Sequence, residues 1–266
     1  MIGELVTAGE QRLLLCRTAG GSGRQPLVLL HGFAGGPAAW AAVIEHLPHE
    51  SLVAVPALPG HDRRADDVPA DFDAVLARLD AALVALHPGP WRLAGYSMGA
   101  RVGLGLLVRT PGRFLLAVLI GLNPGLRSEH ERQERGVWEH AWVRVLREEG
   151  MDGFLPKWEA QPLFASQRHL PEAQRAALRA VRRSHHPEGL ARAVEVLGLA
   201  AMPNYWPLLG EIKVPVRLVV GEGDAKFRLL ADEAVRMFSN ARLHIVPGVG
   251  HNVPLEAPAA TAALLV

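Results

Sequence analysis

Short apolar runs recur along this chain, and a segment with helical periodicity separates most of them from the next. Runs typical of strands fall at 12–18, 26–30, 51–55, 91–94, 115–120, 216–220 and 242–246. Helical patterns fall at 38–47, 71–86, 98–109 and 228–238, and a last helix is expected from about 256. Strands that are apolar throughout are usually buried on both faces. The alternation therefore predicts an α/β fold, with a mostly parallel sheet covered by helices on both faces.

Residues 124–207 interrupt this alternation. The segment has no convincing strand pattern, is rich in Arg, Glu, Trp and helix formers, and is punctuated by prolines. Such a stretch between two core strands is best interpreted as a helical insertion. We therefore expect a core made of residues 1–123 and 208–266, with a helical lid (residues 124–207) over one end of the sheet.

The composition excludes several classes of protein. The net charge of +1 gives no global attraction to nucleic acid or to a membrane surface. A single cysteine, Cys16, allows no internal disulfide and no cysteine-rich metal site. No apolar run approaches the roughly 20 residues of a membrane helix, and the N-terminus does not resemble a signal peptide. We expect a cytoplasmic protein without nucleic-acid, membrane, metal, nucleotide or flavin partners. Oligomeric state leaves no mark on the sequence, and a monomer is the expectation.

One stretch, Gly95-Tyr96-Ser97-Met98-Gly99, matches the pattern G-x-S-x-G between a predicted strand and a predicted helix. The glycines let the helix and a strand approach closely around a strained turn, which would expose the Ser97 hydroxyl above the sheet. The amides at the start of the helix favour negative charge there. The motif alone also fits a glycine-rich turn with an incidental serine. Whether Ser97 is catalytic therefore depends on finding an imidazole and an acid elsewhere in the sequence.

A serine hydroxyl needs an imidazole to become reactive at neutral pH, and the imidazole needs an acid to orient it. Asp224 follows the strand at 216–220 and is the expected acid, with Glu222 as a competitor. His251 follows the strand at 242–246 and is the expected imidazole, although a loop histidine can also be merely solvent-exposed. The order Ser, Asp, His and the position of each at a carboxyl-terminal strand end favour a catalytic triad.

The loop "HGFAGG" (31–36) follows an early strand and suggests an oxyanion site. We expect the backbone amides of Phe33 and Met98 to donate to a developing oxyanion, which such pairs stabilise by a few kcal/mol. His31 is interpreted as structural. The neighbours His185 and His186 show no metal-ligand spacing and are expected at the surface.

Arg101 is the single charge between residues 98 and 108. A helix that is apolar on every face is buried, and a buried guanidinium stays charged and needs an anion. That anion could be an internal carboxylate or a group of the substrate. Because residues four apart share a helix face, Arg101 can point towards the pocket served by Ser97.

At this point the chain resembles a known family. It resembles the α/β-hydrolase fold throughout, and more narrowly the 2-succinyl-6-hydroxy-2,4-cyclohexadiene-1-carboxylate synthases, lyases of menaquinone biosynthesis. The matching motifs are "LLHGFAGG", "LPGH", "GYSMGAR", "NPGL", "WEAQPLFAS", "GEGDAKFR" and "GHN". The first two are common among α/β-hydrolases, whereas the arginine after the serine, "QPLFAS" and "DAKF" are narrower. One departure is "LPGHDRR", where "LPGHG" is usual.

The resemblance implies a triad of Ser97, Asp224 and His251 and no cofactor. It implies substrate binding by Arg101, Arg135, Arg183, Tyr96 and Trp158. Arg182 is an adjacent alternative to Arg183, because the spacing from "PLFAS" is longer than usual.

The implied reaction acts on a small polycarboxylate. It converts 2-succinyl-5-enolpyruvyl-6-hydroxy-3-cyclohexene-1-carboxylate to 2-succinyl-6-hydroxy-2,4-cyclohexadiene-1-carboxylate and pyruvate by a 2,5-elimination. Ser97 would act as the base through His251 rather than as an acylated nucleophile. Two alternatives stay open: a hydrolase that cleaves carboxylic esters or carbon–carbon bonds by serine acylation, and a ligand-binding module without catalysis.

Overall fold

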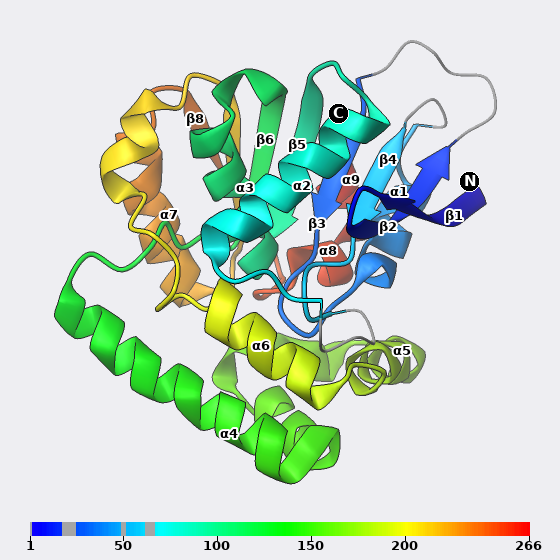
Figure 1. The fold of residues 1–266 in the computed structure, drawn as a ribbon, viewed down its shortest axis with the longest axis vertical. Coiled ribbons are helices and arrows are strands. Elements are labelled where there is room, and N and C mark those ends of the chain that lie inside the picture. Colours follow the sequence, from blue (N-terminus) through cyan, green and yellow to red (C-terminus); the bar gives the residue numbers. More distant parts are fainter. Residues whose placement is uncertain (1, 18–24, 49–51, 62–66) are drawn as a thin grey trace.

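The structure is a computed structural model that describes residues 2–17, 25–48, 52–61 and 67–266. Within these ranges one sheet of eight strands has the order β1-β2-β4-β3-β5-β6-β7-β8 (Figure 1). The strands are β1 (Ile2–Ala8), β2 (Gln11–Arg17), β3 (Leu27–Leu30), β4 (Val53–Pro56), β5 (Trp91–Tyr96), β6 (Phe114–Ile120), β7 (Val216–Gly221) and β8 (Ala241–Val246). Strands β3 to β8 form the parallel part of the sheet. Strand β1 pairs with β2, and β2 with β4, in antiparallel fashion.

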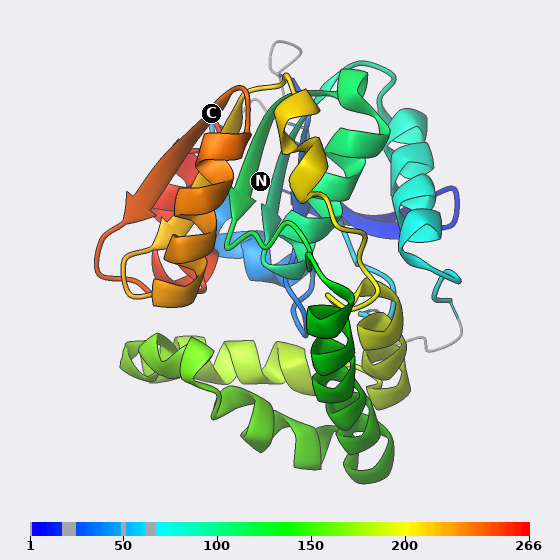
Figure 2. The ribbon, with the colours of Figure 1, turned by 90° about the vertical axis from the view of Figure 1, so that its left-hand side faces the viewer.

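Helices cover both faces of this sheet. The core helices are η1 (Pro37–Trp40), α1 (Ala41–Glu45), α2 (Phe72–Leu86), α3 (Met98–Arg109), η2 (Pro111–Arg113), α7 (Ala225–Met237), α8 (Val253–Glu256) and α9 (Pro258–Ala263). Helices α2 and α3 share one buried apolar cluster with the strands, and α1, α8 and α9 share another, so the two groups lie on opposite faces (Figures 1 and 2). The predicted fold class is confirmed. Every helix in the described part of the chain is too short or too polar to cross a membrane.

The predicted elements match the observed ones with three differences. The last helix, expected from about 256, is instead two short helices, α8 and α9. Strand β1 was not expected from apolar runs, because it is an edge strand whose residues 3–5 and 7 are exposed. The helix expected over 38–47 is instead a 3-10 turn, η1, followed by the short helix α1. The outermost predicted strand residues Thr18 and Ser51, and positions 62–64 of "LPGHDRR", lie outside the described residues.

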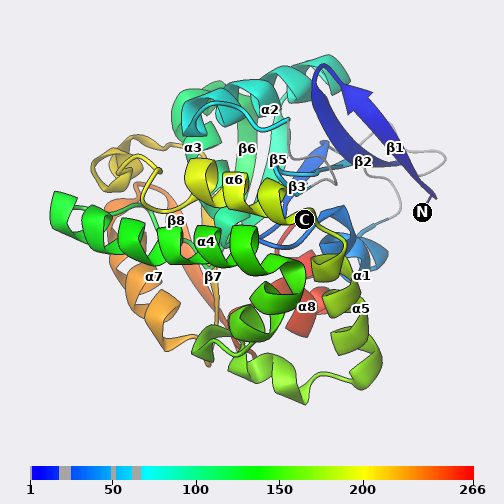
Figure 3. The ribbon, with the colours of Figure 1, turned by 60° about the horizontal axis from the view of Figure 1, so that its bottom comes forward.

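Residues 124–207 are all described and contain no strand. They form α4 (Glu129–Glu159), η3 (Pro162–His169), α5 (Glu172–Arg183) and α6 (Pro187–Leu197), and reach the start of η4 (Trp206–Glu211). These helices lie together on one side of the sheet, in front of it in Figure 3. A capping box of Ser128 and Glu131 starts α4, and Gly150, with φ of +64°, bends it. The two limbs of α4, α6 and Ala34 of the core share an apolar cluster, which joins this segment to the core.

Candidate active site

Ser97 occupies a strained turn between β5 and α3. Its φ of +53° is unusual for a residue with a side chain. A Cβ atom on Gly99 would lie 2.1 Å from the carbonyl oxygen of Leu30, and one on Gly95 would lie 2.3 Å from that of Gly99. Both motif glycines are therefore required by close backbone approach, and the turn has the form that the sequence predicts.

The three predicted triad residues come together. His251 Nε2 lies 3.1 Å from Ser97 Oγ, and His251 Nδ1 lies 2.6 Å from Asp224 Oδ2. The side chains of His251 and Asp224 are almost fully buried. Because Nδ1 donates its proton to the carboxylate, Nε2 is left to accept the serine proton. The competing acid, Glu222, instead accepts a hydrogen bond from the amide of Gly248.

The loop between β3 and η1 brings a second element to Ser97. Within the described residues, the Phe33 amide has no acceptor, and the Met98 amide, the first of α3, has none either. Both residues line the same cavity as Ser97. The next residue, Ala34, has φ of +54°, and its amide donates to His61 Nε2 at 3.1 Å. The hydrogen bond at Ala34 thus holds the loop directly after Phe33, whose backbone amide is the expected oxyanion donor.

His31 and His61 support this loop as neutral imidazoles. His31 Nε2 accepts from the Leu58 amide at 3.0 Å, and its Nδ1 lies 2.9 Å from the Gly32 carbonyl oxygen. Burial lowers the pKa of His31 to about 4 and that of His61 well below its usual range. The structural interpretation of His31 therefore agrees with its contacts.

The expectation of surface positions for His185 and His186 is wrong for His185. Its side chain is buried, and its ring meets the ring of His61 edge-on at 5.5 Å between centroids. Helix α6 begins directly after this pair, so its packing on the core draws His185 inward. His186 is exposed, and its Nδ1 caps α6 by accepting from the amide of Glu188.

A cavity of about 1060 Å³ opens in front of the triad. Its core side is formed by Ser97, His251 and the Phe33 loop, and its other side by residues of α4, η3, α5 and α6. Among the residues that the structure describes, no group of three or more His, Cys, Asp or Glu side chains is arranged to hold a metal ion.

Arg101 lines the cavity, as its helix position predicts. Its Nη1 donates to the Leu197 carbonyl oxygen at 2.7 Å, and no described carboxylate lies within ion-pair distance. Burial lowers its pKa to about 10, while Glu139 acts to raise it and Arg135 to lower it, so the group is charged at neutral pH. Of the two interpretations, these contacts favour an anion of the substrate over an internal salt bridge.

Arg135 lines the cavity from the first limb of α4. Its Nε donates to Glu139 Oε1 at 2.8 Å, and its guanidinium stacks 4.0 Å above the Trp138 ring. Glu139 is buried and also accepts from the amides of Leu199 and Ala200, at 2.7 and 3.1 Å. Glu139 was not anticipated from the sequence, where its spacing of four residues from Arg135 is the single sign of a pair.

The structure places the alternative, Arg182, at the cavity and Arg183 away from it. The Arg183 side chain is 61% exposed, pairs with Asp152 and does not line the cavity. Arg182 is 5% exposed, lines the cavity and lies 5.2 Å from the Phe164 ring centroid. Consecutive helix residues are about 100° apart around the axis, so an error of one position replaces a side chain that faces the cavity with one that faces solvent.

Tyr96 and Trp158 also line the cavity. The Tyr96 ring lies 5.3 Å from the His251 ring, and burial raises the pKa of its hydroxyl well above the usual range. Trp158 stacks on Phe154 at 5.4 Å and meets Phe33 at 5.1 Å. The candidate site residues predicted from the sequence thus all line one cavity, except that Arg182 lies there instead of Arg183.

The comparisons with known proteins agree with this geometry. Residues 27–264 match the model of the alpha/beta hydrolase family, so the chain is a member of that class. It is 33% identical to 2-succinyl-6-hydroxy-2,4-cyclohexadiene-1-carboxylate synthase of Enterobacter sp. (strain 638), over 93% of this chain and 92% of that protein. The synthase of the same name from Salmonella newport (strain SL254) is 34% identical, over 90% of this chain and 92% of that one.

A solved structure, MenH from S. aureus, superposes with a TM-score of 0.90 at 31% identity and covers 95% of both chains. The chain belongs to the 2-succinyl-6-hydroxy-2,4-cyclohexadiene-1-carboxylate synthase family.

Proposed function

We propose that this chain is a carbon–oxygen lyase of menaquinone biosynthesis that eliminates pyruvate from 2-succinyl-5-enolpyruvyl-6-hydroxy-3-cyclohexene-1-carboxylate. The product is 2-succinyl-6-hydroxy-2,4-cyclohexadiene-1-carboxylate. Membership of the synthase family supports the substrate and the product. The observation that carries the proposal is the Ser97–His251–Asp224 relay at a cavity that three guanidinium groups line.

In this mechanism Ser97 is the base. His251 Nε2 takes the serine proton while Asp224 orients the ring and stabilises its positive charge. The serine oxygen then removes a ring proton of the substrate, and the electrons of that carbon–hydrogen bond form the new ring double bond as the carbon–oxygen bond to the enolpyruvyl group breaks. The leaving group departs as the enolate of pyruvate and takes up the proton held by His251, which gives pyruvate and restores the neutral imidazole. The amides of Phe33 and Met98 stabilise negative charge that develops on the succinyl carbonyl oxygen.

The guanidinium groups hold the substrate. Arg101, Arg135 and Arg182 bind its carboxylates, since guanidinium–carboxylate pairs can form two parallel hydrogen bonds and so fix geometry. Tyr96 and Trp158 supply the apolar contacts to the ring. Residues 124–207 act as a lid over a core of residues 1–123 and 208–266. We further propose that the enzyme works in the cytoplasm as a monomer, without membrane or nucleic-acid partners.

A coupled assay for pyruvate on the enolpyruvyl substrate tests the function, run beside a panel of simple carboxylic esters. We expect pyruvate release in step with product formation and no accumulation of an acyl-serine. The absence of pyruvate, together with ester hydrolysis through a stable acyl-serine, would instead identify a hydrolase.

A further inference from the structure

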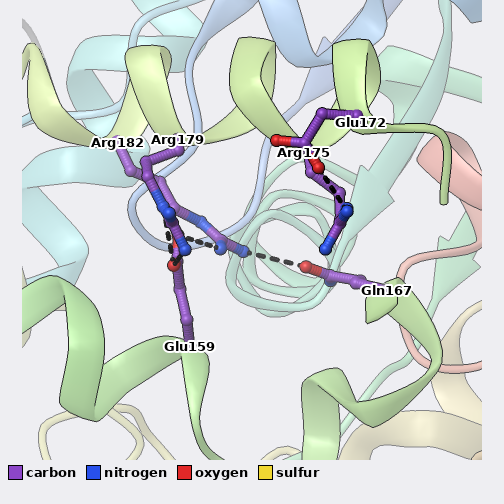
Figure 4. Close-up of polar contacts among 6 residues, drawn as sticks. All are labelled: Glu159, Gln167, Glu172, Arg175, Arg179 and Arg182. Carbon is purple, nitrogen blue, oxygen red and sulfur yellow. Dashed lines mark hydrogen bonds and ion pairs between the residues drawn. The ribbon is translucent and has the colours of Figure 1, made fainter. Parts of the chain in front are cut away.

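Glu159, the last residue of α4, is not among the residues that line the cavity, and two guanidinium groups from α5 pair with it (Figure 4). Arg182 Nη1 donates to Glu159 Oε1 at 3.0 Å, and Arg179 Nε donates to Glu159 Oε2 at 3.0 Å. The second terminal nitrogen of Arg182 donates to Gln167 Oε1 at 3.3 Å. Both terminal nitrogens of Arg182 are therefore held by side chains from other elements, α4 and η3.

Arg182 cannot keep its place without such partners. Its side chain is 6% exposed, and Arg182 is the single buried residue of α5. Its neighbour Phe164 offers no hydrogen-bond acceptor from its ring, and a long guanidinium side chain has many rotamers. Glu159 is the one carboxylate, among the residues described, within ion-pair distance of Arg182. The Glu159 carboxylate thus supplies a negative charge to the buried guanidinium of Arg182 and also fixes its orientation.

The charges of the cluster do not cancel. Two guanidinium groups share the single carboxylate of Glu159, so one unit of positive charge is left over. Partial burial raises the pKa of Glu159, but hydrogen bonds from Arg179 and Arg182 outweigh this and the net pKa is lowered. The carboxylate is therefore ionised at neutral pH, and a substrate carboxylate can still be attracted to Arg182.

We propose that Glu159 is a positioning residue, which fixes Arg182 in the direction that receives one carboxylate of the substrate. The inference rests on the proposed function, because it needs a polyanionic substrate in this cavity. Glu159 itself does not touch the substrate. A purely structural role, as a tether between α4 and α5, would leave substrate affinity unchanged once the protein is folded.

Steady-state pyruvate release by three variants tests the proposal. Glu159→Ala removes both contacts, Glu159→Gln keeps the shape and an acceptor oxygen without the charge, and Arg179→Gln is the matched control. We expect Glu159→Ala to raise KM roughly tenfold with kcat within about threefold of wild type, the pattern of lost uniform binding. Glu159→Gln should raise KM less, and Arg179→Gln should leave it unchanged.

Two further measurements separate positioning from general damage. The inhibition constant of succinate, a small dianion, should rise in parallel with KM in the Glu159 variants. The rate at which neutral phenylmethylsulfonyl fluoride modifies Ser97 should stay the same, because that reaction needs no anion recognition. Unchanged KM and succinate inhibition in a folded Glu159→Ala protein would overturn the proposal, as would a parallel loss of Ser97 reactivity.

The design also separates this inference from the function on which it rests. If wild type releases no pyruvate, the proposed function fails, and calorimetric titration with succinate still compares wild type with the variants. Weaker succinate binding by Glu159→Ala would then support the positioning role, and equal or absent binding would overturn it. If Glu159→Ala does not fold, Glu159→Gln carries the same comparisons.

Discussion

Ser97 and Arg182 face the same cavity, but different forces hold them there. Ser97 sits in a turn fixed by the backbone, with glycines at either side that leave no room for a side chain. Arg182 projects from a mostly exposed helix and depends on the side chains of Glu159 and Gln167. The core half of the site is thus set by the path of the chain, and the half from residues 124–207 by pairs of side chains.

The strongest test of the core half is Ser97→Ala. If the serine is the base, its loss should lower pyruvate release by roughly 10³-fold or more, since residues of a triad act as a unit. Substrate affinity should change little, because the guanidinium groups are untouched. The coupled pyruvate assay and a binding titration measure the two effects, and appreciable residual turnover would rule out the serine as base.

The core half should also respond to acid through His31. Its pKa is about 4 in the folded protein, against 6.5 ordinarily. As pH falls from 6.5 towards 4, the unfolded chain binds a proton that the folded protein does not, so the free energy of unfolding decreases. The decrease from this group should reach about 3 kcal/mol by pH 4 and then stop.

Urea unfolding at several pH values measures that slope. A His31→Gln variant should show a shallower decline, whereas His186→Gln, at an exposed position, should follow wild type. Equal slopes for wild type and His31→Gln would show that His31 does not govern acid sensitivity.

Arg101 belongs to the core helix α3, and the proposed function assigns it to substrate binding. We expect Arg101→Ala to lower kcat/KM by roughly 100-fold, since an anion of the substrate would lose its charged partner. Among the described residues its one side-chain hydrogen bond is to a carbonyl oxygen, so the free energy of unfolding should change by less than about 1 kcal/mol. Arg109→Ala, at the end of the same helix, is the control. Unchanged kinetics would reduce Arg101 to a structural residue.

The smallest effect should separate two adjacent arginines of α5. Arg182→Ala should lower kcat/KM by roughly 30-fold, while Arg183→Ala should stay within about twofold of wild type, because an exposed ion pair contributes little. Equal losses in the two variants would contradict the assignment of Arg182 to the cavity.

The core half was open to prediction because parallel strands end at a common edge. Ser97, Asp224 and His251 each follow a strand of the parallel part of the sheet, so their meeting point follows from the sheet alone. Strand β1 could not be predicted in this way. It lies at the exposed edge of the sheet and lacks a continuous apolar run.

The other half was less predictable because helix rotation magnifies small errors. A shift of one residue separates exposed Arg183 from buried Arg182. Glu139 and Glu159 are ordinary acidic residues of a charged helix in the sequence, and their roles depend on partners brought by folding. The burial of His185 likewise depends on how α6 packs against the core.

The bend of α4 at Gly150 has an optical consequence. Its two limbs bring Trp138, Trp142 and Trp158 to one end of the cavity, and Trp40 lines the cavity from the core. These are four of the six tryptophans in the chain. Filling the cavity with a charged molecule changes the surroundings of most indoles at once. The emission of the unlabelled protein is therefore a direct signal of occupancy, available for every variant described above.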